Sequence, residues 1–397
     1  MPRTPKNIPH DHWKLAMTRG IGPIEGRNLL EAFGGATQVL AASVAELAEV
    51  LRRGADEVRR NMDAVNVARE LEEMDRESVC GMLPGDDDWP ELLKTATPEP
   101  LALWVRGAFQ EADRFSVAVV GSRICTAYGM EQADRFAGWL AQQGFTIVSG
   151  GARGIDAAAH RSALRHHGRT VVVLAGGVGR AYPPEHAPLF DSVVAAGGVL
   201  CSEFPTYHPS EGGLFPRRNR IISALSLGTL LIEARLNSGA LITGRLAAES
   251  HGREVMAVPG RIDSPSSEGC HRAIREGWAA LVTNVADVSQ QLRSSSMLVA
   301  GAMAAQARVG TGDCIGVGAS AGAGACIGAE ANLLHEVKPT SGVLKLTPAM
   351  ELVLQAARSM RSIDYDVLSQ KTNLGIAEVM AAVTRLELSG IRLRNNG

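Results

Sequence analysis

The sequence predicts an α/β protein built around a doubly wound, Rossmann-like central domain. From about residue 115 to residue 284, short continuous apolar runs alternate with segments of helical spacing. Continuous apolar runs suit strands buried on both faces of a parallel sheet. Their alternation with helices is typical of a doubly wound fold. The predicted strands are residues 117–120, 145–148, 170–174, 229–232 and 254–258, and the predicted helices between them are residues 130–143, 155–166, 218–226 and 240–251.

Smaller regions flank the Rossmann-like domain, which we assign to residues 81–290. Residues 1–80 carry helical patterns only and predict a small all-helical domain. Its Gly-Ile-Gly-Pro turn at residues 20–23 fits a helix-hairpin-helix module that binds phosphate and a plain αα-hairpin equally well. Residues 291–344 are rich in Gly and Ala and predict a flexible linker. Residues 345–397 predict a winged-helix-like domain.

The winged-helix-like prediction depends on three helical segments followed by a short strand. The third helix would be the recognition helix, but it offers one arginine and carries two glutamates. Contact with a protein is therefore a better expectation for this domain than the reading of duplex DNA. The helices are expected at residues 351–358, 365–370 and 376–387, and the strand at residues 391–394.

The composition is that of an ordinary soluble globular protein. The 397 residues include 40 Lys and Arg and 42 Asp and Glu, for a formal net charge of −2. Binding to nucleic acid through overall charge is therefore excluded, and any such binding must be local. The six cysteines form no Cys-x-x-Cys pair, so we expect reduced thiols in a cytoplasmic protein without a metal. No apolar stretch suits a signal peptide or a membrane span.

A cluster of arginines opens one of the predicted helices. Residues 215–220 read Phe-Pro-Arg-Arg-Asn-Arg, and the proline suits the first turn of a helix. Arg217, Arg218 and Arg220 are thereby held near a helix N-terminus, whose free N–H groups and dipole already favour anions. Guanidinium groups match phosphate oxygens two at a time. The sequence therefore predicts a phosphate-rich ligand here.

Glycines and arginines also follow two of the predicted strands. Residues 121–123 read Gly-Ser-Arg, and residues 149–154 read Ser-Gly-Gly-Ala-Arg-Gly. Ligands of doubly wound sheets bind beyond the carboxyl ends of the strands. Glycine lets a phosphate approach the backbone. We therefore expect Arg123, Arg153 and the arginines of residues 217–220 to face one crevice.

The usual enzymatic uses of such a crevice find little support in the sequence. Residues 121–126 lack Gly-x-Gly-x-x-Gly, and no Walker sequence exists, so no nicotinamide, flavin or ATP cofactor is expected. Glu203 and Glu233 fall near strand ends and could form an acid/base pair. With so many arginines nearby, neutralisation of charge is the better interpretation of both.

Taken together, these segments resemble the DNA-processing protein A family, also called DprA or Smf. The resemblance covers the whole α/β region in order. The motifs that carry it are Gly121-Ser122-Arg123, Ser149-Gly150-Gly151-Ala152-Arg153-Gly154-Ile155-Asp156, Tyr182-Pro183, Ser202-Glu203, Phe215-Pro216-Arg217-Arg218-Asn219-Arg220, Ser238-Gly239-Ala240-Leu241-Ile242-Thr243 and Val258-Pro259-Gly260.

The resemblance implies a non-catalytic protein that binds single-stranded DNA in natural transformation and recombination. Members of the family form homodimers, load the recombinase RecA and help to displace single-strand-binding protein. The N-terminal helices resemble the family's sterile-alpha-motif-like domain. The residues implied for single-stranded DNA binding are Gly121, Ser122, Arg123, Ser149, Gly150, Gly151, Arg153, Phe215, Arg217, Arg218, Asn219, Arg220, Ser238 and Gly239.

Two other functions stay open. A nucleotide phosphoribohydrolase of the lysine-decarboxylase-like group shares this kind of modified Rossmann sheet. Its Pro-Gly-Gly-x-Gly-Thr-x-x-Glu motif aligns with residues 226–233, where the Pro-Gly-Gly is missing and Glu233 would be the catalytic acid. A pure scaffold, with terminal domains that bind proteins and a vestigial crevice, is the third possibility.

Overall fold

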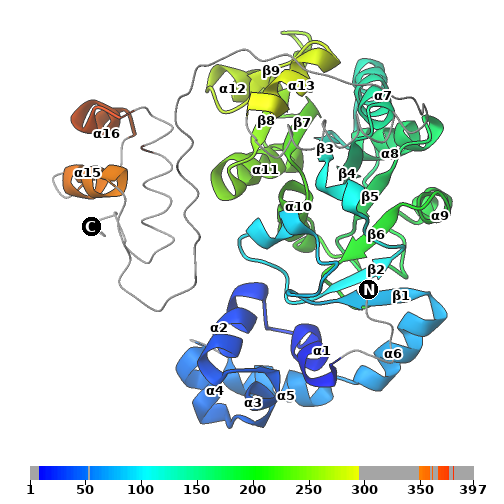
Figure 1. Ribbon diagram of the computed structural model, residues 1–397, viewed down its shortest axis with the longest axis vertical. Coiled ribbons are helices and arrows are strands. Elements are labelled where there is room, and N and C mark those ends of the chain that lie inside the picture. Colours follow the sequence, from blue (N-terminus) through cyan, green and yellow to red (C-terminus); the bar gives the residue numbers. More distant parts are fainter. Residues whose placement is uncertain are drawn as a thin grey trace, which may run out of the picture. The chain divides into compact units, whose positions relative to one another are not determined.

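The computed structural model describes residues 9–51, 54–294, 348–357, 360, 365–374 and 379 of the chain. The chain divides into two compact units, Met1–Gly310 and Thr311–Gly397. Figure 1 shows the helices and strands of both. In the part of the chain that is described, no helix is both long enough and apolar enough to cross a lipid bilayer.

A nine-stranded sheet forms the centre of the first unit. From one edge to the other its order is β1-β2-β6-β5-β4-β3-β7-β8-β9. All pairs are parallel except β1 with β2 and β2 with β6. The strands are β1 (Val79–Met82), β2 (Leu103–Arg106), β3 (Ser116–Gly121), β4 (Thr146–Ser149), β5 (Thr170–Val173), β6 (Val199–Ser202), β7 (Gly228–Glu233), β8 (Glu254–Ala257) and β9 (Ala280–Leu281).

The prediction of a largely parallel sheet wound between helices is confirmed. All five predicted strands are present, as β3, β4, β5, β7 and β8. From β3 the chain adds β4, β5 and β6 on one side, and it then returns to add β7, β8 and β9 on the other. The order therefore reverses between β3 and β7, which is where a doubly wound sheet binds its ligands. The short strands β1, β2, β6 and β9 were not predicted.

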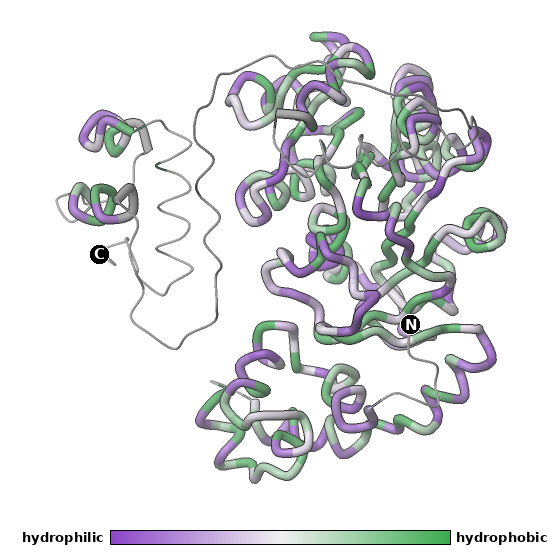
Figure 2. Tube along the Cα trace, in the orientation of Figure 1, coloured by the Kyte–Doolittle hydropathy of each residue, from purple (hydrophilic) through white to green (hydrophobic). Residues whose placement is uncertain are grey.

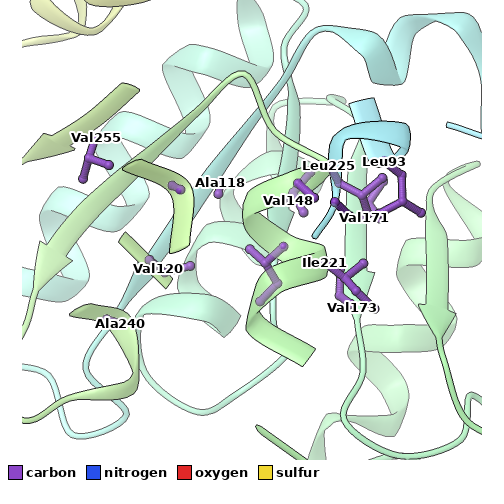
Figure 3. Packing of buried hydrophobic residues seen from close by; sticks show 14 of the residues in the cluster. Leu93, Ala118, Val120, Val148, Val171, Val173, Ile221, Leu225, Ala240 and Val255 are labelled. Atoms are coloured by element: carbon purple, nitrogen blue, oxygen red, sulfur yellow. The ribbon is translucent and has the colours of Figure 1, made fainter. Parts of the chain in front are cut away.

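Helices cover both faces of the sheet. Val117 and Val119 of β3 pack under one layer, whereas Ala118 and Val120 pack under the other, because successive side chains of a strand point to opposite faces. Figure 2 colours the chain by hydropathy and shows that the strands are mostly hydrophobic. Figure 3 shows Ile221 and Leu225 packed among valines of the strands. One layer holds α7 (Ala127–Gln142), α8 (Ile155–Arg165), α9 (Ala187–Ala195) and α13 (Val285–Ser294), and the other holds α10 (Leu214–Ala224), α11 (Gly239–Arg245) and α12 (Glu268–Arg275).

The N-terminal residues form six helices with an apolar core of their own. Leu15, Leu29, Leu47 and Met62 are fully buried in that core. The same region also packs on the antiparallel edge of the sheet, where the Trp13 and Trp104 rings lie 4.5 Å apart. The helices are α1 (His10–Met17), α2 (Pro23–Phe33), α3 (Ala36–Ala41), α4 (Val44–Val50), α5 (Ala55–Ala64) and α6 (Val67–Arg76).

The C-terminal unit contains two described helices, α15 (Pro348–Ala357) and α16 (Tyr365–Thr372), near the first two that were predicted. The predicted third helix at residues 376–387 and strand at residues 391–394 lie outside the described elements. Most of the predicted linker also lies outside the described residues. Its first four residues, 291–294, are an exception, because they belong to α13. α13 therefore extends four residues past the predicted start of the linker.

Candidate functional site

A cavity of about 700 Å³ opens at the carboxyl ends of the strands, beside the point where the strand order reverses. Its wall includes the turn after β3, the start of α10 and the turn from β7 into α11. Three arginines line it, Arg123, Arg218 and Arg235, against a single carboxylate, Asp156. The cavity is thus locally cationic in a chain that is close to neutral overall.

Arg218 is the innermost of these arginines, with a relative exposure of only 4%. Its Nη1 donates to the carbonyl oxygens of Gly150 and Val173, at the ends of β4 and β5. Burial lowers its pKa to about 10, and the charge of Asp156 opposes that shift. The guanidinium therefore keeps its charge at neutral pH, and the strand ends hold it in place.

Asn219 links Arg218 to the other wall of the cavity. Its side-chain oxygen accepts from Arg218 Nε at 3.2 Å, and its amide donates to the Gly239 carbonyl oxygen at 3.1 Å. Gly239 begins α11, and the hydroxyl of Ser238 caps that helix by accepting from the Leu241 amide at 3.5 Å. The motifs at residues 218–219 and 238–239 are therefore one connected structure.

Gly150 leaves the space that the Arg218 guanidinium occupies. A Cβ built on Gly150 would lie 2.6 to 2.7 Å from three atoms of that group. Such a distance is shorter than any real contact, so an alanine would have to push the guanidinium aside. The glycine after β4 therefore makes room for an arginine of the protein itself, and it does not line the cavity.

Arg123 stands at the open side of the cavity, where it is exposed. Its guanidinium carbon lies 4.5 Å from the centre of the Phe215 ring, a cation–π contact. The Tyr182 ring lies 5.6 Å from the Phe215 ring and completes this side of the cavity. Cationic and aromatic surfaces are thus presented together at the opening.

Local hydrogen bonds fix the turn that carries Arg123. The Ser122 hydroxyl donates to the Ile124 carbonyl oxygen at 2.7 Å, so it shapes the turn. Glu233, at the end of β7, accepts from the amide of Thr126 at 2.8 Å and from its hydroxyl at 2.6 Å. Gly121 leaves room for Ile155, because an added Cβ would lie 2.6 Å from that side chain.

Several residues that were expected at the crevice lie elsewhere. Ser149 is fully buried and donates to the Val119 carbonyl oxygen at 2.6 Å. Gly151 has a positive φ of 67° and accepts from His186 through its carbonyl oxygen. Arg153 pairs with Glu185 at 2.5 Å. None of these residues lines the cavity.

Arg217 and Arg220 were also expected to face the crevice, but neither lines the cavity. Both turn towards Glu203, which forms an ion pair with Arg220 and lies 3.8 Å from Arg217. The reason is the geometry of the helix. At 100° per residue, positions 217 and 220 point away from the side on which Phe215 and Arg218 face the cavity.

The two glutamates near strand ends do not form an acid/base pair. Glu203 follows β6 and Glu233 ends β7, and three strands lie between β6 and β7 in the sheet. Strand spacing alone puts them about 19 Å apart. Neutralisation of charge is confirmed for Glu203 by its arginine partners, whereas Glu233 instead holds the Thr126 turn.

Six polar or aromatic residues that line the cavity were not among the predicted site residues: Asp156, Tyr182, Ser210, Arg235, Asn237 and Thr243. Asp156 is buried, which raises the pKa of its carboxyl, while Arg218 and Arg123 act in the opposite direction. Arg235 and Asn237 lie between β7 and the Ser-Gly turn, in a stretch whose position at a strand end could have identified them.

Comparison with known proteins gives a consistent result. Residues 81–293 match the model of a family described as DNA recombination-mediator protein A. The protein Smf of Escherichia coli (strain K12) is 46% identical over 214 residues, 53% of this chain and 56% of that protein. The chain thus spans little more than half the length of this relative.

A further relative and a solved structure, both from Streptococcus pneumoniae, also resemble the chain. The DNA processing protein DprA of Streptococcus pneumoniae (strain ATCC BAA-255 / R6) is 40% identical over 206 residues, 51% of this chain and 71% of that protein. The X-ray structure of DNA processing protein A (DprA) from Streptococcus pneumoniae has a TM-score of 0.62 and 32% identity. That match covers 73% of this chain and 99% of the other.

Proposed function

The chain belongs to the DNA recombination-mediator protein A family, and we propose that it binds single-stranded DNA in the cavity at β3 and β7. The observation that carries the proposal is the charge of this cavity, three arginines against one carboxylate. Arg218 is held by strand-end carbonyls, so it pays little further ordering cost when a phosphate arrives. Arg123 stands at the opening, where a polynucleotide backbone passes.

A single strand fits this opening better than a duplex does. Arg123, Phe215 and Tyr182 offer a guanidinium and two rings within contact distance of one another. Unpaired bases can stack on aromatic rings while arginines follow the phosphates. In a duplex the faces of the bases are already stacked, so these rings would have nothing to bind.

We extend the proposal to the partners of the family. The chain acts in recombination and natural transformation as a homodimer that loads RecA and helps to displace single-strand-binding protein. Family membership supports this extension. The cytoplasm is its proposed location, because Cys80, Cys125, Cys201 and Cys270 are all free thiols in the described part of the chain.

We propose that this chain has no catalytic activity. A phosphoribohydrolase would use Glu233 as its acid, but both oxygens of that carboxylate accept hydrogen bonds from Thr126. Those bonds fix the turn before α7. Glu233 would have to release the turn in order to reach a substrate.

The test is equilibrium binding of the full chain to fluorescein-labelled oligothymidylate and to a duplex of equal length. We expect tighter binding to the single strand and a linear fall of log K with log salt concentration, of slope about −0.7 per phosphate contacted. Equal affinity for both DNAs would contradict the proposal. Release of free base from a nucleoside monophosphate, lost on Glu233→Gln, would favour the enzyme instead.

A further inference from the structure

A second cation–aromatic cluster lies outside the cavity. The guanidinium carbon of Arg217 lies 5.2 Å from the centre of the Phe204 ring. On Phe204 lies the His208 ring, with its centre 4.9 Å away and its plane tilted by 31°. Phe204 and His208 are half-buried, and the Arg217 side chain keeps 35% of its exposure. The cluster therefore reaches solvent as a small aromatic platform topped by a cation.

The charge of this cluster exceeds what the protein itself neutralises. Glu203 is buried and forms a close ion pair with buried Arg220. Arg217 approaches the same carboxylate only at 3.8 Å. Two arginines thus share one carboxylate, and Arg217, the less buried of the two, carries the surplus positive charge. A surplus cation stacked on one aromatic ring has an unfilled capacity for an anion.

The loop that carries the platform is held rigidly from two sides. Glu70 of α6 accepts from the amide of Thr206 at 2.8 Å and from its hydroxyl at 2.7 Å. On the other side, the amides of Gly177 and Gly179 donate to the carbonyl oxygens of His208 and Thr206. A ligand that binds this loop therefore does not have to order it first.

We propose that Arg217, Phe204 and His208 form an outer subsite for the single-stranded DNA that leaves the cavity. Arg217 contacts a phosphate, and the rings of Phe204 and His208 stack with a base. The inference rests on the proposed function of the cavity, because Phe215, Arg217 and Arg218 share the first turns of α10. A DNA strand that crosses the end of α10, a helix about 10 Å wide, passes from the cavity to the outer subsite.

Oligonucleotide length separates the two sites. We compare oligothymidylates of about two and about twenty nucleotides, because only the longer one is expected to occupy both sites. Arg217→Gln and Phe204→Leu should each weaken binding of the longer strand by about fivefold and leave the shorter one unchanged. Arg123→Gln should weaken both strands. Arg135→Gln, which removes an exposed arginine from α7, is the matched control and should change neither.

Each result has a defined meaning. If wild type binds neither strand, the proposed function itself fails. If wild type binds both and Arg217→Gln binds the longer strand as wild type does, the outer subsite is wrong. Should Arg217→Gln or Phe204→Leu fail to fold, Arg217→Lys replaces them, because it keeps the charge and loses the planar stack. Weaker binding of only the longer strand by Arg217→Lys than by wild type supports the outer subsite, and wild-type affinity in this variant excludes a role for the stack.

Discussion

The Arg123 guanidinium lies over the face of the Phe215 ring, with 4.5 Å between its carbon and the ring centre. Arg123 follows β3 and Phe215 belongs to α10, so the contact joins two strand-to-helix connections across the cavity. Within the described residues Arg123 forms no ion pair, whereas Arg153 pairs with Glu185. Two exposed arginines from similar turns therefore differ in what they can offer to a ligand.

This difference predicts that Arg123→Ala weakens DNA binding and that Arg153→Ala leaves it unchanged. Arg123→Ala should weaken binding to single-stranded DNA by about tenfold, because a charge-assisted phosphate contact is lost. The loss should be the same for oligo-dT, oligo-dA and oligo-dC, since phosphate contacts carry no base information. Arg153→Ala removes the same charge outside the cavity and is the control. Equal losses in fluorescence anisotropy titrations of the two variants would contradict our site.

Gly150→Ala should damage the cavity without changing its charge. The added Cβ would lie 2.6 Å from the Arg218 guanidinium, which must move away from the carbonyl oxygens that hold it. We expect weaker DNA binding and a loss of about 1–3 kcal/mol in the free energy of unfolding. Gly213→Ala is the matched control, because its Cβ meets open space at the start of α10. Both quantities follow from urea titration and anisotropy.

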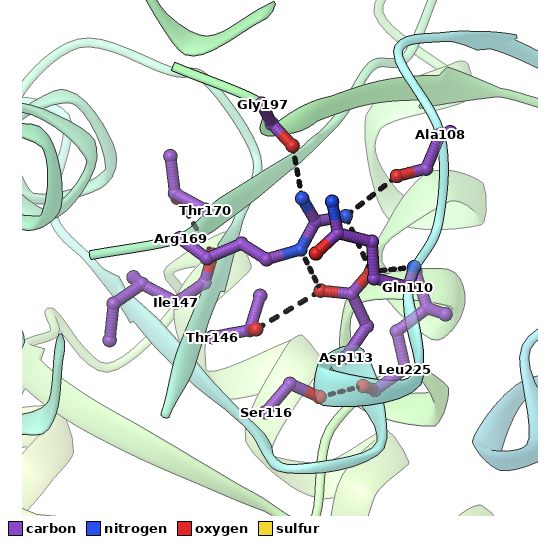
Figure 4. Close-up of polar contacts among 10 residues, drawn as sticks. All are labelled: Ala108, Gln110, Asp113, Ser116, Thr146, Ile147, Arg169, Thr170, Gly197 and Leu225. Atoms are coloured by element: carbon purple, nitrogen blue, oxygen red, sulfur yellow. Dashed lines mark hydrogen bonds and ion pairs between the residues drawn. The ribbon is translucent and has the colours of Figure 1, made fainter. Parts of the chain in front are cut away.

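Breaking the buried ion pair between Arg169 and Asp113, which lies far from the cavity, should lower the stability of the protein. Their ion pair lies at the amino ends of β4 and β5, away from the cavity. Figure 4 shows that Thr146 donates to Asp113 and that Arg169 donates to the Ala108 and Gly197 carbonyl oxygens. Arg169→Met leaves a buried carboxylate without its cation and should cost about 3–5 kcal/mol of unfolding free energy.

DNA affinity of the folded Arg169→Met protein should stay at the wild-type value. The control is Arg114→Met, in which an exposed pair with Glu111 is lost at a cost of about 0–1 kcal/mol. Urea denaturation measures both variants. Equal costs would mean that the buried pair contributes no more than a surface pair does.

Buried histidines predict a loss of stability in acid. Burial lowers the pKa of His160 to about 3 and that of His251 to about 4. In the unfolded chain both titrate near 6.5, so below that pH the unfolded chain binds protons that the folded one does not. Stability is complete above about pH 6.5 and falls by about 2 kcal/mol per histidine by pH 5. Urea denaturation above pH 6.5 and at pH 5 measures this loss of unfolding free energy.

His160→Asn should reduce this acid dependence, because one of the two proton sites is removed. Asn can keep a hydrogen bond to Thr170, whose hydroxyl lies 2.7 Å from His160 Nδ1. His167→Asn, at an exposed position of positive φ that Asn tolerates, is the control. An unchanged pH profile in His160→Asn would exclude His160 as a source of the effect.

The sequence predicts most of the central fold because buried parallel strands are continuous apolar runs. The four strands that it misses are short, and two of them, β1 and β2, pair antiparallel at the edge, where no intervening helix marks them. Of the site, Arg123, Phe215 and Arg218 are predicted from residue type and position. Whether they line a cavity is a question of geometry, which residue type alone does not answer.

The error over Arg217 and Arg220 has a different origin. Residue type alone groups all the arginines of α10, but the turn of the helix sends these two towards Glu203. The spacing of 3.6 residues per turn was available from the sequence. Glu203 was expected near a strand end with arginines nearby, but no residue pattern identified Arg217 and Arg220 as its partners. In the same way, nothing in the sequence linked Arg153 to Glu185.

One oxygen atom of Glu70 accepts from the Trp104 indole at 2.8 Å and from both donors of Thr206. A shortened protein that began at β1 would leave these three donors without an acceptor. Each donor that stays buried without a hydrogen bond would cost about 1–3 kcal/mol of unfolding free energy. Removing α1 to α6 therefore also destabilises the part of the protein that remains. It would loosen the support beneath Phe204, so a truncated protein that binds DNA poorly would say little about whether those helices ever touch DNA.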